Sequence, residues 1–267
     1  MKISGWIGAV IVAVTAVIAA VSLVWTPFDP LHAIAADRLQ GPGGEYLLGT
    51  DRFGRDVLSR LMAGAQITLF VGVVAVGIAA LIGVPLGIAA AMHKSIDAVI
   101  MRLSDLLLAF PALLTAIIAG AVWGPSTLTA MIAIGIAGIP SFARVSRAGA
   151  LQVNNLDFIA SARISRVAAP VIAVRHILPN IVGMVIVQAS VYFALAILAE
   201  AALSYLGLGT SAPTPSWGRM LHDGQTLLSA HPLLTVFPGL AIALTVLGFN
   251  LLGDGLRDSI DPQRRQF

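Results

Sequence analysis

The sequence predicts an all-α membrane protein with six transmembrane helices, and three observations support this: composition, the length of the apolar runs, and the distribution of basic residues. Hydrophobic residues make up 58% of the 267 residues, charged residues only 11%, and the mean hydropathy is +0.92. A soluble domain carries roughly 25% charged residues, so this balance is typical of a polytopic membrane protein. The absence of cysteine excludes disulfides and thiolate metal sites within the chain.

Six apolar runs are long enough to cross a bilayer, which requires about 17–25 residues. They lie at about 5–25, 67–92, 99–122, 126–142, 181–206 and 233–253. The first run is expected to be retained as a membrane helix, because its apolar stretch exceeds the roughly 7–15 residues of a signal-peptide core. In the second run, Gly83 and Gly87 have the spacing that lets two helices approach closely.

The basic residues predict the orientation of these spans. With the N-terminus inside, 11 of the 16 Lys and Arg residues lie on the cytoplasmic side, including Lys2, Arg264 and Arg265. Short cytoplasmic loops are normally enriched in basic residues. We therefore expect both termini and residues 143–180 to be cytoplasmic, and residues 26–66 and 207–232 to face outward.

The chain divides accordingly into four parts. These are a first transmembrane helix over 1–26, an external loop with an interfacial helix over 27–66, a membrane core over 67–255 that contains a cytoplasmic loop at 150–180, and a cytoplasmic tail over 256–267. The interfacial helix is predicted from the amphipathic spacing of Val57, Leu58, Leu61 and Met62.

The external loop contains the string LGTDRFGRDVLSR at 48–60, in which acidic and basic residues alternate with glycines that permit turns. An ordered motif is expected to involve Gly49, Thr50, Asp51, Gly54, Arg55 and Asp56. The alternative is a solvated loop with local ion pairs, each contributing at most about 1 kcal/mol.

A basic, polar stretch between two apolar runs, DFIASARISRVAAPVIAVRHILPN at 157–180, predicts a cytoplasmic docking element. Asn155 or Asp157 can cap a helix that begins near 158, and Pro170 should end it near 168 or 169. An apolar patch for a partner groove is expected from Phe158, Ile159, Ala162 and Ile164. The alternative is a disordered basic loop beside anionic lipid. The candidate coupling residues are Asp157, Phe158, Ile159, Ala160, Ser161, Ala162, Arg163 and Arg166.

Several strings, in order and at the expected spacing, resemble ABC-importer permeases of the dipeptide, oligopeptide and nickel family (the DppC/OppC type). Besides residues 48–60, they are MRLSDLLLAFPALL at 101–114, ARVSRAGAL at 143–151, EAALSYLGLG at 200–209 and PTPSWGRML at 213–221. The resemblance covers roughly 45–255. It implies the transmembrane domain of a type I ABC importer, which forms half of a pathway for peptides or a related solute such as a nickel chelate or haem.

In that family the cytoplasmic loop couples transport to ATP hydrolysis on another subunit, and this chain departs from the family pattern there. The family has Glu-Ala-Ala followed by glycine, whereas this chain has Ala160-Ser161-Ala162 and then Arg166. The missing glutamate removes a possible salt bridge to the ATPase. Because an arginine resists positive φ, we expect an atypical contact or a helix that extends towards Pro170.

Three further residues are candidates for a structural or gating role. Arg102 and Asp105, three residues apart on one helix, are expected to pair. Glu200 is the only acidic residue well inside an apolar run, and it is either a structural anchor or a contact for solute or ion. His93, His222 and His231 are isolated and lack the spacing of metal ligands, so no metal site is predicted.

No enzymatic activity is expected of the chain itself. A phosphate-binding loop needs a Gly-Lys-Ser/Thr sequence, but only Lys2 and Lys94 are present and neither follows a glycine.

The resemblance implies several partners in a bacterial inner membrane. Two ATP-binding subunits would bind ATP and Mg²⁺, a second homologous permease would form a heterodimer with this chain, and an external substrate-binding protein would deliver the solute. Membrane lipid is the other partner, and no nucleic acid is expected. A secondary transporter, a channel and a non-transporting scaffold are the alternatives, and co-purification with an ATPase would discriminate against all three.

Overall fold

The computed structural model describes residues 3–260, within which the regular structure is helical and no β-strand occurs. The elements, in chain order, are α1 (Ile3–Val21), the 3-10 helix η1 (Ala35–Asp37), α2 (Val57–Met92), α3 (Lys94–Ala109), α4 (Ala112–Trp123), α5 (Thr127–Asn154), α6 (Asp157–Ile164), α7 (Ala169–Ile172), the π-helix η2 (Ala173–Ile177), α8 (Leu178–Tyr205), α9 (Trp217–Gly224), the 3-10 helix η3 (Gln225–Leu227) and α10 (Leu233–Ile260).

The predicted all-α membrane fold is confirmed, with one correction to the third span. Five helical segments are long and apolar enough to cross a membrane. The sixth candidate is the pair α3 and α4, which is bent by 79° between the two helices. The predicted span over 99–122 is therefore two helices and not one, because Pro111 interrupts it. The first five residues of the predicted cytoplasmic tail, 256–260, belong to α10. The basic residues Lys2, Arg264 and Arg265, which contribute to the predicted orientation, lie outside the described residues.

The predicted interfacial helix is not a separate element. Residues 57–62 form the first turns of α2, which continues without a break through 36 residues, about 54 Å. Its start is set by Asp56, whose side chain accepts a hydrogen bond from the backbone N–H of Ser59 at 2.7 Å. This side chain satisfies one of the free N–H groups at the helix N-terminus.

The helices α2 and α5 pack closely along their cytoplasmic halves. A Cβ atom added at Gly83 would lie 2.6 Å from the Ile139 carbonyl oxygen, and one at Gly87 would lie 2.3 Å from the Ala143 carbonyl oxygen. Both distances are too short for a side chain, so only glycine permits this approach. The contact predicted from the spacing of these two glycines is confirmed.

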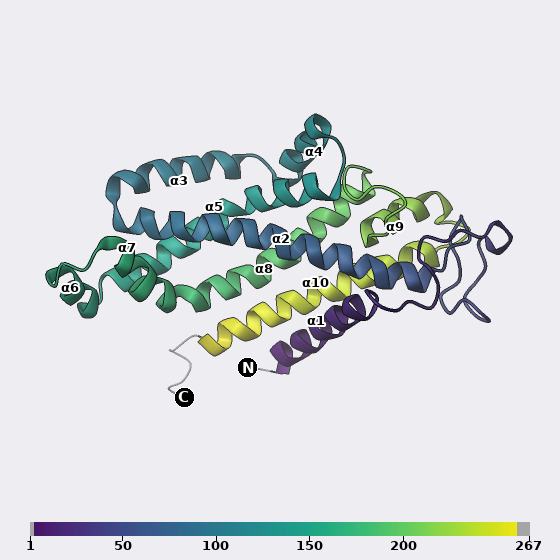
Figure 1. The fold of residues 1–267 in the computed structure, drawn as a ribbon, viewed down its shortest axis with the longest axis horizontal. Coiled ribbons are helices and arrows are strands. Elements are labelled where there is room, and N and C mark those ends of the chain that lie inside the picture. The colour runs from purple at the N-terminus through teal and green to yellow at the C-terminus, as the bar shows by residue number, and fades with distance from the viewer. Residues whose placement is uncertain (1–2, 261–267) are drawn as a thin grey trace.

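The two segments that carry the sequence motifs lie at opposite ends of the bundle (Figure 1). One end carries α6 and α7, and the start of α1 and the end of α10 lie towards it. The other end carries the loop between α1 and α2 together with α9. Helix α1 runs along α10, where the hydroxyls of Thr15 and Thr245 lie 3.3 Å apart. This arrangement agrees with the predicted topology.

Candidate functional site

Helix α6 is a short, eight-residue helix whose start differs from the expectation. Its N-cap residue is Leu156, which makes no side-chain capping hydrogen bond, and Asp157 is the first helical residue. Neither Asn155 nor Asp157 caps the helix, so that prediction is wrong. The Asp157 carboxylate in the first turn still interacts favourably with the positive end of the helix dipole.

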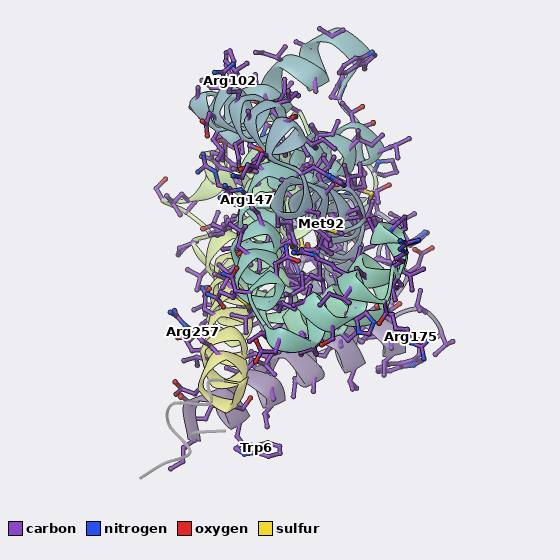
Figure 2. The ribbon with its side chains drawn as sticks, turned by 90° about the vertical axis from the view of Figure 1, so that its left-hand side faces the viewer. Trp6, Met92, Arg102, Arg147, Arg175 and Arg257 are labelled. Carbon is purple, nitrogen blue, oxygen red and sulfur yellow. The ribbon has the colours of Figure 1, made fainter. Side chains whose placement is uncertain are left out.

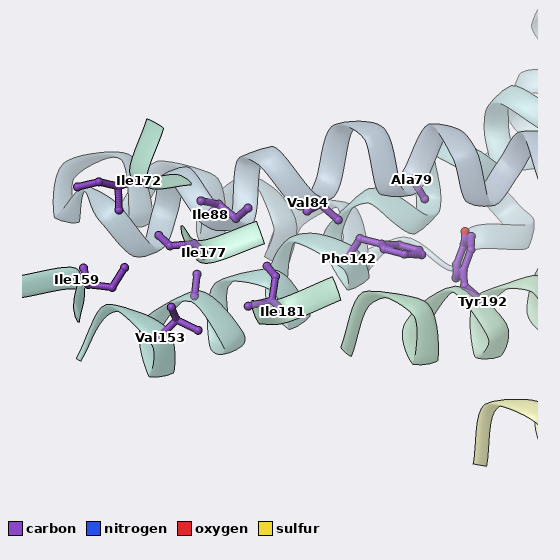
Figure 3. Packing of buried hydrophobic residues seen from close by; sticks show 11 residues of the cluster. Ala79, Val84, Ile88, Phe142, Val153, Ile159, Ile172, Ile177, Ile181 and Tyr192 are labelled. Atoms are coloured by element: carbon purple, nitrogen blue, oxygen red, sulfur yellow. The ribbon is translucent and has the colours of Figure 1, made fainter. Parts of the chain in front are cut away.

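The predicted apolar patch on α6 divides into a buried part and an exposed part. Ile159 is fully buried within the chain itself, in a cluster with Val153 of α5, Ile172 of α7 and Ile177 of η2 (Figure 3). Ala162 packs against the same cluster. Ile159 therefore attaches α6 to its own bundle and is not available to a partner, contrary to the expectation for this residue.

The outward face of α6 combines apolar and basic side chains. Phe158 is 43% exposed and Ile164 is 83% exposed. Arg163 and Arg166 are also exposed, and Arg163 donates a hydrogen bond to the Asn154 side chain at 3.1 Å. Ala160 and Ser161, at the positions of the family's Glu-Ala, are exposed as well. This face is a candidate contact surface for another subunit.

Arg166 occupies the position of the family's glycine and adopts the glycine-like conformation. Its φ is 55°, in the left-handed region that non-glycine residues rarely visit. The N–H of Val167 donates to the Ala162 carbonyl and the N–H of Arg166 to the Arg163 carbonyl. These two bonds are those of a Schellman motif, which satisfies the last carbonyls of a helix. The helix thus ends at Ile164, and the expected extension towards Pro170 is wrong.

Replacing Arg166 with glycine should therefore stabilise the turn. A left-handed conformation costs a non-glycine residue roughly 1–2 kcal/mol, and the extra backbone entropy of glycine offsets part of this gain. We expect Arg166→Gly to slow amide hydrogen exchange at residues 163–168 several-fold, with transport retained. Arg163→Gly, which places glycine inside the helix, should have the opposite effect on the same amides. Faster exchange of these amides in Arg166→Gly would show that the left-handed conformation of Arg166 does not destabilise the turn.

The helical segment from Ala169 to Tyr205 contains a π-helical turn at 173–177. Here the N–H of Leu178 donates to the carbonyl of Ala173, five residues back. Pro179 follows directly, lacks an N–H and would clash with the carbonyl four residues earlier in a regular α-helix, so the wider turn accommodates it. The segment therefore remains helical through η2 and into α8, despite this proline.

At the opposite end, the external motif at 48–60 folds into a tight turn rather than a solvated loop. Gly49 and Gly54 both have φ of +78°. A Cβ at Gly54 would lie 1.9 Å from the Ile34 carbonyl oxygen. The turn is closed by backbone hydrogen bonds from Gly54 N–H to the Asp51 carbonyl and from Asp51 N–H to the Arg55 carbonyl.

Polar side chains of the motif complete this turn. Thr50 donates to the Asp37 carbonyl and accepts from the N–H of Gln40. The Asp51 carboxylate accepts from the N–H of Phe53 at 2.8 Å and of Arg55 at 3.1 Å. Nearby, the Tyr46 hydroxyl donates to the Asp37 carboxylate, and this hydrogen bond raises the pKa of Tyr46 to about 12. Hydrogen bonds among its own residues thus hold the part of the loop from Asp37 to Arg55 in one conformation.

The motif belongs to a larger ionic cluster, here called the outer cluster, that sequence reasoning did not find. Its members are two carboxylates and four guanidinium groups from the loop, α2 and α9: Asp51, Arg52, Arg55, Arg60, Arg219 and Asp223. The Asp223 carboxylate lies within 4 Å of all four arginines, and Arg60 is only 2% exposed. Residues more than 160 positions apart meet here, and no local pattern in the sequence predicts that contact.

Glu200 is fully buried at the outer end of α8. One of its oxygens, Oε1, accepts hydrogen bonds from the hydroxyls of Ser204 at 2.7 Å and Thr210 at 3.3 Å. The Thr210 hydroxyl also bonds to that of Thr127 at the start of α5, at 3.2 Å. The other oxygen, Oε2, has no hydrogen-bond partner among the described residues. This geometry favours the structural anchor over the solute contact, because the carboxyl group links α8 to α5 and does not reach the surface.

The predicted pair of Arg102 and Asp105 is not formed. Asp105 instead pairs with Arg144 of α5, and a second ion pair joins Asp97 of α3 to Arg147 of α5. Figure 2, which views the α6 end of the molecule, shows Arg102 at the outer edge of α3. The three-residue spacing allows Arg102 and Asp105 to pair on one helix. In the structure, however, the carboxylates of α3 form their ion pairs with arginines of the neighbouring helix α5.

A double-mutant cycle should separate the two pairings. Asp105 and Arg144 are well exposed, so their coupling energy should be small, about 0.2–1 kcal/mol. We expect Asp105→Asn and Arg144→Gln to be non-additive in thermal stability of the purified protein, and Asp105→Asn and Arg102→Gln to be additive. Coupling of Asp105 to Arg102 instead of Arg144 would restore the original prediction.

The sequence is similar to those of known proteins over most of its length. Residues 83–266 match the family model described as a binding-protein-dependent transport system inner membrane component. A dipeptide transport system permease protein of Alkalihalophilus pseudofirmus is 44% identical over 86% of this chain and 76% of its own length. Glutathione transport system permease proteins of Pectobacterium atrosepticum and Escherichia coli are 41% and 42% identical over 89% and 92% of this chain, and over 79% and 82% of their own lengths.

Proposed function

The chain belongs to the family of binding-protein-dependent transport system inner membrane components, and we propose that it forms half of the translocation pathway of an ATP-driven importer for peptides. In this proposal a second, homologous permease provides the other half. Two ATP-binding subunits, which hold ATP and Mg²⁺, dock at the cytoplasmic end, and an external binding protein delivers solute to the opposite end. The relatives named for dipeptide and glutathione transport support a small peptide as solute, and nickel chelates and haem remain within the family's range.

The observation that carries the coupling role is the packing of Ile159. This side chain is fully buried against α5, α7 and η2, whereas Phe158 and Ile164 of the same short helix point outward. A displacement applied to the outward face is therefore transmitted through a dry, close-packed contact, because such packing resists compression. We propose that closure of the ATP-binding subunits moves α6 and, through Ile159, the helices around it.

The helical segment that begins at α7 can carry this displacement across the membrane. It extends over 37 residues, about 55 Å, from the Ile159 cluster to the hydrogen bonds of Glu200. Thr210 and Thr127 continue those bonds to the start of α5. A movement of α6 would thus be transmitted along α8 to the outer end, where these hydrogen bonds pass it on to α5.

The proposal is tested by assembling the importer. The chain is co-expressed with a second, homologous permease and two ATP-binding subunits, purified, and reconstituted in liposomes with a binding protein. We expect co-purification of the ATP-binding subunits and ATP-dependent uptake of at least one member of a panel of dipeptides, glutathione, a nickel chelate and haem. Uptake driven by an ion gradient without ATP would instead support a secondary transporter, and no uptake of any panel member would contradict the transport proposal.

The orientation can be tested separately, because the chain contains no cysteine. Ala160 is exposed on α6, so a cysteine there should react with a membrane-impermeant thiol reagent only from the cytoplasmic side. Glu45, exposed in the external loop, is the matched position for the outer side. We expect Glu45→Cys to be labelled in intact cells and Ala160→Cys only after the cells are opened. Labelling of Ala160→Cys in intact cells would reverse the topology.

A further inference from the structure

The break between α3 and α4 has a cause in the sequence. Pro111 has no N–H and disfavours a helical conformation in the residue before it, and Phe110 is accordingly extended, with φ of −93° and ψ of 123°. The two helices meet at 79°. Residues 105–114, here called the elbow, are exposed at every position, so the rest of the described chain covers them only in part.

The elbow lies at a depth where a membrane is expected. Asp105 pairs with Arg144, which sets the level of α3 against α5. Arg144 lies about 26 Å along α5 from its outer end at Thr127, and Phe110 lies about 8 Å from Asp105 back towards that outer end. The break is therefore roughly 18 Å below the outer end of α5, well inside a hydrocarbon layer about 30 Å thick.

Main-chain groups at the break have no partner within the described residues. Four carbonyls at the end of α3, those of residues 107–110, accept no backbone hydrogen bond there. Three N–H groups at the start of α4, those of residues 112–114, donate none, and the first bond of that helix runs from Thr115 to the Pro111 carbonyl. Each unsatisfied group costs several kcal/mol in lipid, so irregular backbone at this depth does not face hydrocarbon.

We propose that the elbow lines the water-filled translocation pathway, and that its free main-chain groups are hydrogen-bonding partners for the peptide bonds of the solute; this inference rests on the proposed peptide transport. The side chains of residues 106–114 are all apolar. A dry protein neighbour would have to supply a matched polar group for each free carbonyl and N–H. Water can donate to each free carbonyl and accept from each free N–H without being positioned by a fixed neighbour. A peptide main chain can do the same, because it carries N–H and C=O groups whatever its side chains are.

The inference is tested by the water accessibility of a cysteine at the elbow. Phe110 is 63% exposed, and Val17 on the peripheral helix α1 is 59% exposed and serves as the lipid-facing control. Because only the thiolate reacts and it forms in water, Phe110→Cys should react with an impermeant thiol reagent on the order of tenfold faster than Val17→Cys in the reconstituted importer. A saturating dipeptide, delivered by the binding protein, should slow the reaction of Phe110→Cys several-fold. Leu114→Cys, on the α4 side of the elbow, repeats the measurement should Phe110→Cys fail to assemble.

The outcomes separate this inference from the proposed function. If both variants transport peptide and Phe110→Cys reacts no faster than Val17→Cys, the elbow is dry and the inference is overturned, while the transport proposal stands. Fast reaction that the dipeptide does not slow would overturn the assignment of the main-chain groups to the solute. Absence of ATP-dependent uptake by the unmodified importer would overturn the proposed function itself, regardless of the labelling rates.

Discussion

Replacing Asp223 with asparagine should lower the free energy of unfolding by about 3–5 kcal/mol, the usual cost of removing one partner from a buried ion pair. Its carboxylate oxygens lie 3.2 Å from Arg52, 3.5 Å from Arg55, 3.9 Å from Arg60 and 3.3 Å from Arg219. Asparagine has the same shape but no charge, so Arg52 and Arg219 would lose their ion pairs with Asp223, and Arg55 and Arg60 would keep only Asp51. Arg60 is buried and cannot recover its hydration. Denaturant titration of the purified protein in detergent measures the change.

The matched control is Asp105→Asn, which removes the same charge from a pair in which the carboxylate side chain is 65% exposed. That change should cost no more than about 1 kcal/mol, because solvent screens the remaining arginine. Equal effects of the two substitutions would mean that the outer cluster is hydrated and does not hold the external loop to α9.

Replacing Phe158 with serine should uncouple transport from ATP hydrolysis while leaving α6 folded. A large apolar side chain buried in a partner groove typically contributes 2 kcal/mol or more, so the affinity for the ATP-binding subunits should fall about 30-fold or further. Ile159 would still attach α6 to the bundle. The measurements are co-purification of the ATP-binding subunits and the ratio of peptide imported to ATP hydrolysed.

Two variants control this result. Ile159→Ala removes the intramolecular contact and should destabilise the packing of α6 by roughly 2–5 kcal/mol, which faster hydrogen exchange at 155–168 would reveal. Val236→Ser, at a position on α10 with the same 43% exposure as Phe158, should change neither docking nor exchange. Normal transport by Phe158→Ser with its ATP-binding subunits bound would show that docking occurs elsewhere.

Helix α6 illustrates how far the local sequence could be interpreted. The polar island between two apolar runs correctly indicated a short helix at this position, and Phe158 and Ile164 correctly indicated exposed apolar side chains. The role of Ile159 could not be predicted, because its neighbours come from three other elements. The conformation of Arg166 could not be predicted either, because the propensity of arginine opposes positive φ and the two hydrogen bonds of the turn outweigh it.

The sequence by itself determined where the apolar segments lie and the close approach of α2 and α5, because these depend on composition, on length and on the absence of a side chain at Gly83 and Gly87. Only the tertiary structure decided which charges meet. Asp51 and Asp223 share their arginines across more than 160 residues, and Asp105 pairs with Arg144 on another helix. An ion pair depends on distance in space, and spacing along the chain defines that distance only within a single helix or turn.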